Sequence, residues 1–430
     1  MNLVWFRNDL RVSDNKILGK ACEGEQVIAL YCFDPKQYEL SEYGFKKTEK
    51  YRAQFLIETV KELKENLKKL NIALFVYYEK PEIAISKLAK DYNIENIYLQ
   101  KEWTRDENEV LKNVKENITT SVNVIEIFDQ FLFHPEDIPY ENYQQLPEVF
   151  TNFRKKCEKY SKVRPTLPIP NPLPERNLLD STTKIPGLRD LGLSDFDKDA
   201  RTAFPFKGGE SRAIARINEY FWETKKLAYY KKTRNGLLGK DYSSKLSAWL
   251  ANGSISPRTI YWEVKRFEKE IKKNQDTYWL IFELIWRDYF KYISLKHGDK
   301  IFHQGGILKK EYEWNNSSEA LESWINGTIN ESFVNANMRE LALTGWMSNR
   351  GRQNVASFWS KELKQDWRVG ASYFESLLVD YDVHSNWGNW MYNSGVGNDP
   401  RDRKFNIKRQ ADMYDRNGAF QNQWLQETLF

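Results

Sequence analysis

GWMSNRGRQNVASFWSKELKQDWRVGASYFESLLVDYDVHSNWGNWMY, residues 345–392, holds five of the chain's 15 tryptophans, interleaved with asparagine, aspartate and arginine. Each indole ring favours burial, while its N–H group needs a hydrogen-bond partner. A basic, tryptophan-dense stretch with polar side chains at intervals indicates a wet pocket for a large planar ligand. The alternative interpretation is a helical core that is simply rich in aromatic residues.

The composition of the 430 residues describes a globular protein of two or three domains. Hydrophobic residues make up 41% and charged residues 29%, which excludes a disordered chain. No apolar run approaches the roughly 20 residues of a membrane span, and the N-terminus lacks a signal-peptide layout. We therefore expect a cytoplasmic protein with no membrane contact, and a monomer. The net charge of +5 permits an anionic partner. Three scattered cysteines favour apolar packing over a disulfide framework or zinc site.

Residues 1–128 alternate β-rich apolar runs with amphipathic helical patterns. The apolar runs lie at 3–6, 27–33, 73–78, 96–99 and 122–128. Apolar side chains repeat at helical spacing at Leu56, Val60, Leu63, Leu67 and Leu70. A second helix is predicted at 81–92. The alternation predicts a doubly wound parallel sheet, which binds ligands at the carboxyl ends of its strands. No G-x-G-x-x-G dinucleotide fingerprint is present.

A connector and a helical region follow this α/β domain. Residues 129–195 are rich in proline and show little periodicity, which predicts a connector draped over the surface. Residues 196–430 are helical in pattern almost throughout, with one helix predicted to begin at Ser256-Pro257. Most tryptophans lie after residue 240, so stacking chemistry is expected in this all-α domain.

Two segments of the helical region have the composition of an anion site. Ser243, Ser244 and Ser247 lie where a loop enters a helix, beside Lys245. Free N–H groups and hydroxyls at a helix start suit a pyrophosphate, although an ordinary serine-rich cap has the same sequence. The second segment is basic and contains Arg350, Arg352, Arg401, Arg403 and Lys404. It predicts a phosphate track, or alternatively a solvated basic face.

Two further constellations leave alternatives open. Glu283 and Arg287 form an i, i+4 pair on either side of Trp286. They are either a surface ion pair or, because the neighbours are apolar, a buried charge that needs a partner. In DYDVHSNWGNW (380–390), two aspartates and a histidine alternate at 380, 382 and 384, which fits a metal site or a polar loop. No other His or Cys cluster supports a metal.

Five ordered motifs resemble the photolyase/cryptochrome flavoprotein family across essentially the whole chain. They are WFRNDLRVSDN (5–15), SSKLSAWLANGSISPR (243–258), FELIWRDYF (282–290), NANMRELALTGWMSNR (335–350) and DYDVHSNWGNW (380–390). Three more are similar to the DASH cryptochrome branch: TRNGLLGKDYS (233–243), GRQNVASFW (351–359) and GVGNDPRDRKFNI (395–407). The resemblance implies an N-terminal antenna domain and an all-helical domain that holds a folded FAD, with no metal and no signalling tail.

The resemblance also assigns cofactor positions. Those around FAD are Tyr230, Ser243, Ser244, Lys245, Leu246, Ser247, Arg287, Asn349, Asp380, Asp382 and Asn386. Asp380 is expected to pair with Arg287 beside the flavin ring, and Asn386 to face flavin N5. Glu102 matches the residue that binds a folate antenna, 5,10-methenyltetrahydrofolate.

The implied activity is blue-light-driven repair of cyclobutane pyrimidine dimers in DNA by electron transfer from excited reduced flavin. The dimer pocket corresponds to Glu283, Trp286 and Asn349, and the electron relay to Trp390, Trp367 and Trp314. DNA-contacting positions are Arg350, Arg403, Gln353 and Tyr392. Gln353 and Tyr392 replace the Met and Trp of double-strand photolyases, which indicates a preference for single-stranded DNA.

Two rival functions remain open. One is a photoreceptor that signals through the flavin redox state without repair, and the other is a nucleic-acid-binding regulator whose flavin is vestigial. Retention of the dimer-pocket residues favours repair, because a pure sensor does not need them.

Overall fold

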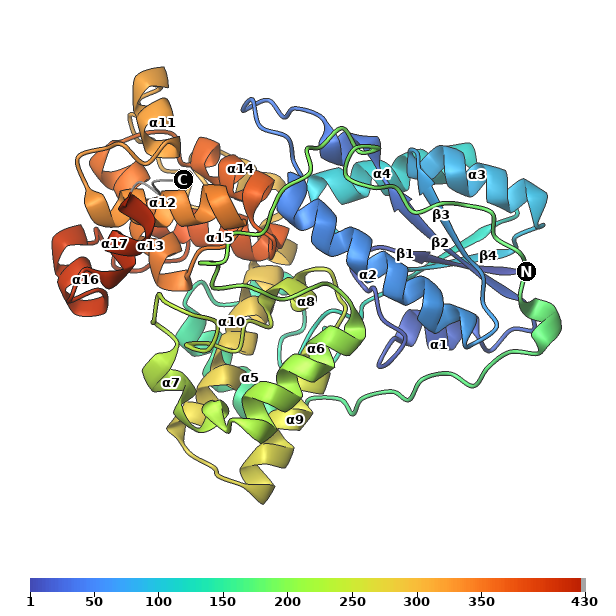
Figure 1. Ribbon diagram of the computed structural model, residues 1–430. Helices are drawn as coiled ribbons and strands as arrows, with labels where there is room; N and C mark the ends of the chain where they lie inside the picture. The colour runs from blue at the N-terminus through green and yellow to red at the C-terminus, as the bar shows by residue number, and fades with distance from the viewer. Residues whose placement is uncertain (427–430) are drawn as a thin grey trace.

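The computed structural model describes residues 1–426, which form an α/β domain and a helical domain packed side by side (Figure 1). The strands are β1 (Asn2–Phe6), β2 (Val27–Phe33), β3 (Leu74–Tyr78), β4 (Asn96–Gln100) and β5 (Asn123–Ile127). The helices between them are α1 (Lys16–Ala21), α2 (Lys50–Lys68), α3 (Pro81–Asp91) and α4 (Arg105–Asn117). The five predicted strands and the two predicted helices are confirmed.

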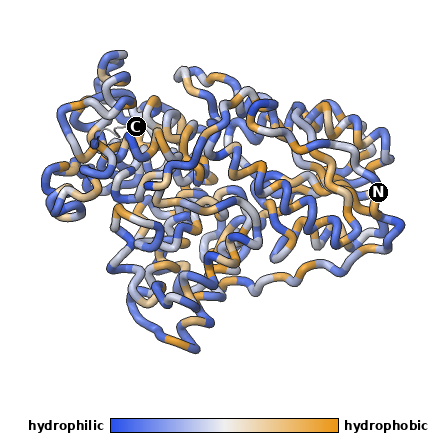
Figure 2. Tube along the Cα trace, in the orientation of Figure 1, coloured by the Kyte–Doolittle hydropathy of each residue, from blue (hydrophilic) through white to orange (hydrophobic). Residues whose placement is uncertain are grey.

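The sheet is parallel, with the strand order β3-β2-β1-β4-β5. α1 and α2 pack on one face and α3 and α4 on the other, so the central strands are apolar on both sides. Figure 2 shows these strands as the most continuous hydrophobic part of the α/β domain. β1 lies between β2 and β4, where the chain reverses direction across the sheet. A doubly wound sheet binds ligands at this position.

The predicted connector, 129–195, is not irregular throughout. It contains the helix α5 (Phe150–Tyr160), in which Phe153 and Cys157 are fully buried in the core of the helical domain. The apolar positions 150, 153 and 157 follow helical spacing, so packing against the helical domain stabilises this segment. The proline-rich remainder runs back along the α/β domain as an extended chain (Figure 1).

The helical domain surrounds one large aromatic core. Its helices are α6 (Glu210–Ile217), α7 (Tyr230–Thr233), α8 (Ser247–Ala251), α9 (Pro257–Glu270), α10 (Gln275–His297), α11 (Ser318–Ile325), α12 (Ser332–Thr344), α13 (Asn349–Ser357), α14 (Trp367–Leu377), α15 (Val383–Ser394), α16 (Ile407–Tyr414) and α17 (Ala419–Leu425). The predicted start of α9 is confirmed, since the Ser256 hydroxyl accepts the N–H of Thr259 and Pro257 is the first helical residue.

A buried ion network joins the two domains. Arg258 of α9 lies 2.8 Å from Asp14 and 2.8 Å from Asp129, and Arg11 lies 2.8 Å from the other oxygen of Asp129. All four side chains are almost fully buried, so each charge depends on the others for compensation. Two of these residues come from the N-terminal WFRNDLRVSDN motif, which therefore contacts the helical domain.

Two expectations drawn from composition concern the whole chain. Cys22, Cys32 and Cys157 carry free thiols, and Cys157 is buried. Within residues 1–426, no helix combines the length and the apolar character needed to cross a bilayer.

Candidate functional site

A cavity of about 400 Å³ lies among α7, α8, α10, α13 and α15 of the helical domain. We call it the helical cavity. Its lining contains most of the predicted site residues: Tyr230, Ser243, Ser244, Lys245, Leu246, Ser247, Glu283, Trp286, Arg287, Asn349, Gln353, Asp380, Asp382, Tyr392 and Arg403. A small adjoining cavity of about 60 Å³ shares four of these residues and adds Asn386 and Trp390. Residues from distant parts of the sequence thus converge on one site.

The serine-rich loop forms one wall of the helical cavity. The buried Arg216 of α6 donates to the backbone carbonyls of Ser243 and Ser244, which fixes the path of the loop. α8 begins at Ser247, and no serine side chain caps it. Ser243, Ser244 and Ser247 all line the cavity, and the loop is not an ordinary serine cap.

Lys245 in this loop has a buried amino group. Its Nζ makes no hydrogen bond and lies over the rings of Tyr242 (3.2 Å) and Trp346 (4.6 Å). Burial lowers the pKa of Lys245 well below its usual value, although the nearby Glu340 opposes this shift. A cation without a hydrogen-bond partner at the wall of a cavity fits an anionic ligand.

Asp380 pairs with Arg352 of α13. Nη2 of Arg352 lies 2.8 and 3.0 Å from the two oxygens of the Asp380 carboxylate. Arg287 instead donates to the backbone carbonyls of Gln130 (2.7 Å) and Leu250 (3.1 Å). The predicted pair of Asp380 with Arg287 is therefore wrong, because Arg287 points from α10 toward the connector and α8. Because Arg352 pairs with Asp380, it does not form part of the predicted phosphate track.

Asp382 has a different partner. Its carboxylate accepts the N–H of Ser385, which caps α15, and lies 3.1 Å from Nζ of the buried Lys291. Burial opposes the charged form, but Lys291, followed by His384, holds the pKa of Asp382 well below its usual range. The cap fixes the start of the helix that carries Asn386 and Trp390.

The alternative metal site is not formed by these side chains. Nδ1 of His384 lies 2.7 Å from the Ser294 hydroxyl, and its ring stacks on Trp103. Asp380 and Asp382 are engaged by Arg352 and Lys291. In the part of the chain that the structure describes, no group of three or more His, Cys, Asp or Glu residues is placed to hold a metal.

Polar and aromatic side chains line the outer part of the helical cavity. Glu283 lies 2.6 Å from Arg234, so the i, i+4 pair with Arg287 is not formed. Burial raises the pKa of Glu283, and the charge of Arg234 opposes this shift. Trp286 makes an edge contact with Tyr392, whose hydroxyl accepts from Arg403 at 2.9 Å.

Arg350 lies outside the lining of the cavity. Its guanidinium stacks over Tyr414 of α16 and reaches the side-chain oxygens of Asn235 and Gln410. This places a further cation between α13, α16 and the end of α7.

The three predicted relay tryptophans lie along α14 and α15 and in the loop before α11. Trp390 and Trp367 are buried, and Trp314 is partly exposed and contacts Tyr312. Each makes its ring contacts with other aromatic residues: Trp390 with Phe374 and Trp324, and Trp367 with Trp387. All five tryptophans of 345–392 are buried, so both the ligand-pocket and the aromatic-core interpretations of that stretch hold in part.

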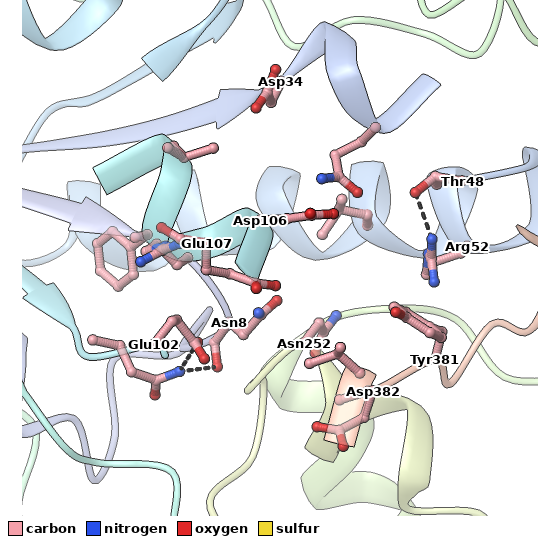
Figure 3. Close-up of a pocket in the computed structure, with 18 of the residues that line it drawn as sticks. Asn8, Asp34, Thr48, Arg52, Glu102, Asp106, Glu107, Asn252, Tyr381 and Asp382 are labelled. Carbon is pink, nitrogen blue, oxygen red and sulfur yellow. Dashed lines mark hydrogen bonds between the residues drawn. The ribbon is translucent and has the colours of Figure 1, made fainter. Parts of the chain in front are cut away.

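A second cavity of about 220 Å³ lies between the two domains, at the carboxyl ends of β1, β2 and β4. We call it the interdomain cleft. Figure 3 shows Glu102 and Asn8 of the α/β domain near Asn252 and Asp382 of the helical domain. Glu102 is 6% exposed and accepts from the Gln100 amide at 2.8 Å.

Several buried polar atoms of this cleft have no hydrogen-bond partner. They are Oε1 of Gln100, Nε2 of His384, Nη1 of Arg7 and Nη1 of Arg52. Unsatisfied buried donors and acceptors around one cavity indicate a polar ligand. Ala251, Arg287 and Asp382 line both this cleft and the helical cavity, so the two sites share a wall.

Sequence reasoning assigned no role to several residues of the helical cavity. Arg234, Tyr242, Trp346 and Asn389 all line it. The signal at Arg234 was its position one helical turn after Tyr230 in a basic segment. Tyr242 immediately precedes the serine-rich loop. Local sequence gave no sign that Asn389 faces inward.

Comparison with known proteins identifies relatives of the whole chain. The family model described as "DNA photolyase" matches residues 2–175, and "FAD binding domain of DNA photolyase" matches 279–429. A cryptochrome DASH from Gloeobacter violaceus is 47% identical over 99% of this chain and 85% of its own length, and one from Danio rerio is 46% identical over 98% and 82%. The crystal structure of a Synechocystis cryptochrome superimposes with a TM-score of 0.94 at 45% identity, covering 99% and 88% of the two chains.

The residues of the helical cavity fit FAD. The unpartnered Lys245 ammonium suits a phosphate, and the Arg352–Asp380 pair and Asn386 supply donors and acceptors for a polar ring edge. The Asn386 amide nitrogen donates to the carbonyl of Ala371 at 3.0 Å, which fixes the orientation of the side chain.

Proposed function

Because the chain belongs to the photolyase/cryptochrome family and to its DASH branch, we propose that it repairs cyclobutane pyrimidine dimers in single-stranded DNA by blue-light-driven electron transfer. One observation carries the proposal. The residues suited to FAD and those suited to a flipped dimer line the same helical cavity, with Glu283 and Trp286 on its α10 wall.

When bound, reduced FAD supplies the excited-state electron that splits the dimer ring. The protein positions the lesion and excludes water. Trp286 and Tyr392 offer aromatic surface to the dimer, and Asn349 and Gln353 offer amides from α13. A flipped dimer fills such a pocket at lowest free-energy cost when it comes from an unpaired strand.

Glu283 stabilises the negative charge that develops on the dimer. Burial raises its pKa and the charge of Arg234 opposes this shift; in this proposal the carboxyl takes up a proton when the dimer is bound and donates a hydrogen bond to a pyrimidine carbonyl oxygen. Arg234 holds the carboxyl in place and adds positive potential at the same point.

The interdomain cleft holds the antenna in this proposal. A carboxylate at Glu102 suits the paired N–H donors of a pterin ring, and the unpartnered atoms of Gln100 and His384 suit its remaining polar edge. The antenna proposed is 5,10-methenyltetrahydrofolate. The shared wall of Ala251, Arg287 and Asp382 keeps it close to the helical cavity.

The relay tryptophans serve to reduce the flavin in this proposal. Trp390 borders the small cavity beside Asn386, and Trp367 lies one helix away on α14. The same relay would serve a photoreceptor without repair activity, so the relay alone does not separate the two functions.

The decisive experiment starts from the absorption spectrum of the purified protein. Bands of flavin and of methenyl-folate are expected. The reduced protein is then illuminated with dimer-bearing oligonucleotides in single-stranded and double-stranded form, and restored thymines are counted by chromatography. Splitting in the single strand supports the proposal. Flavin photoreduction without splitting in either form would favour the photoreceptor, and a protein that cannot be reconstituted with FAD would contradict both.

A further inference from the structure

An array of aromatic rings leads from the helical cavity along α10. The ring of Trp286 stacks on Phe150 of α5, with centroids 3.7 Å apart and an interplanar angle of 11°. Phe150 meets Phe282 edge-on at 5.2 Å, and Phe282 stacks on Trp279 at 4.4 Å and 25°. Phe282 and Trp286 line the cavity, whereas Trp279 lies beyond its lining, one helical turn toward the N-terminus of α10.

Cations cover the outer part of this array. Nζ of Lys231 lies 4.3 Å from the Trp279 centroid, and the Arg234 guanidinium lies 5.6 Å from the same ring. Arg154 of α5 lies 5.6 Å from Phe282. Lys231 is exposed, whereas Arg234 and Arg154 are partly buried and pair with Glu283 and Glu158, each at 2.6 Å. Among the described residues, Lys231 is therefore the cation at Trp279 that makes no ion pair.

This combination matches what a single nucleic-acid strand needs. Bases stack on aromatic rings irrespective of sequence, while cations follow the phosphates. An exposed ammonium such as Lys231 leaves the ring face for a phosphate when a base takes its place on Trp279. A paired base does not offer its face in this way, because its neighbours in the duplex already cover it.

We propose that Trp279 is a stacking platform for an unpaired base that flanks the dimer, with Lys231 contacting an adjoining phosphate. The inference rests on the proposed function and deepens it, because it names a residue that selects single strands. Gln353 and Tyr392 act on the dimer itself, whereas Trp279 acts on its neighbour.

The test measures binding of fluorescein-labelled single-stranded oligonucleotides that carry one thymine dimer. Each has either intact flanking bases or an abasic site directly 5′ or 3′ of the dimer. The wild-type protein is expected to bind the intact strand about tenfold more tightly than one of the two abasic strands. Trp279→Leu is expected to lose this difference, and Trp279→Phe to retain part of it. The matched control is Trp262→Leu, which changes an exposed tryptophan of α9 outside the array.

Circular dichroism and flavin content verify that each variant folds. Equal loss of affinity for intact and abasic strands in Trp279→Leu would overturn the platform, as would no loss at all. An undamaged strand of the same sequence keeps the two proposals separate. If the wild-type protein fails to prefer the dimer, the proposed function fails, while dependence on the flanking base can still be read from the undamaged strand.

Discussion

Asp380 is buried, and Arg352 is the residue that compensates its charge. The two are 28 residues apart in the chain, and no local pattern identifies which of several nearby arginines makes the contact. Arg287 is an equally plausible partner from the sequence, and only the packing of α10 against α8 and the connector removes it. The sequence therefore predicts the residues of the cavity well and their pairing poorly.

This pairing predicts a specific pattern of energetic coupling. In a double-mutant cycle of Asp380→Asn with Arg352→Gln, we expect a coupling free energy of about 1–3 kcal/mol in urea unfolding. The matched cycle of Asp380→Asn with Arg287→Gln is expected to be additive within about 0.5 kcal/mol. A larger coupling free energy in the Arg287 cycle than in the Arg352 cycle would show that Arg287 is the true partner.

Glu283 is predicted to contribute to dimer splitting and not to flavin retention. Glu283→Gln keeps the shape of the side chain but removes both the ionisable group and the ion pair with Arg234. We expect normal flavin content and a repair rate lowered about tenfold, the typical effect of weakening one hydrogen bond to a developing charge. The check is chromatographic counting of repaired thymines per unit of light, and an unchanged yield would remove Glu283 from the mechanism.

Glu340 predicts a pH dependence of stability. It is buried, neither of its oxygens has a hydrogen-bond partner, and burial raises its pKa to about 8. The native state therefore holds this proton more tightly than the unfolded chain, so the free energy of unfolding falls as pH rises from about 4.5 toward about 8. The free energy of unfolding of Glu340→Gln is expected to exceed that of the wild type by more than about 1 kcal/mol near the upper end of this pH range. The advantage should disappear near the lower end.

Urea unfolding across this pH range measures the effect. Glu322→Gln, which changes an exposed glutamate of α11, is the control and should follow the wild-type profile. A constant difference between Glu340→Gln and the wild type at every pH would contradict the assignment.

At the scale of elements, α14 and α15 are packed unusually closely. Gly370 of α14 faces the ring of Trp390 on α15, and a Cβ at this glycine would contact Cη2 of the ring and lie 2.7 Å from Cζ3. The position of Trp390, a predicted relay tryptophan, thus depends on the absence of a side chain at Gly370 of the neighbouring helix. The sequence predicts that this region is mostly helical, but it does not predict this contact.

Gly370→Ala is expected to displace Trp390. Overpacking of this kind costs about 1–3 kcal/mol in unfolding free energy, and the displaced ring should slow flavin photoreduction. Gly19→Ala in α1 is the control, because nothing lies within 4 Å of its added methyl group and a helix gains up to about 1 kcal/mol from the change. Photoreduction in blue light with an external reductant gives the rate. A Gly370→Ala protein as stable as wild type would contradict the close packing.

At the scale of the whole molecule, the parts that local sequence predicts are those whose own residues carry a clear pattern. The strands of the sheet and the start of α9 fall into this class, since apolar runs and a Ser-Pro cap specify them directly. Local sequence does not predict α5, because the buried face of this helix is stabilised by a domain that lies later in the chain. The interdomain cleft belongs to neither domain alone, and its signals in the sequence are the predicted parallel sheet, which binds ligands at the carboxyl ends of its strands, and a single glutamate, Glu102.

We expect Arg258 to contribute to the union of the two domains. In Arg258→Met, Asp14 would lose the ion pair it makes with this guanidinium, and Asp129 would keep only Arg11. Loss of one member of a buried ion network typically costs about 3–5 kcal/mol. Arg266→Met on the same helix removes an exposed pair with Glu263 and is expected to cost less than about 1 kcal/mol.

Because the ion network spans the boundary between the domains, its loss should also make the two domains unfold less cooperatively with each other. Most tryptophans lie in the helical domain, so tryptophan fluorescence follows mainly that domain, whereas far-ultraviolet circular dichroism follows both. We expect coincident urea transitions by the two probes in the wild type and in Arg266→Met, and separated transitions in Arg258→Met. Coincident transitions in Arg258→Met would mean that apolar contacts alone unite the domains. In that case the interdomain cleft would keep its shape without the buried charges.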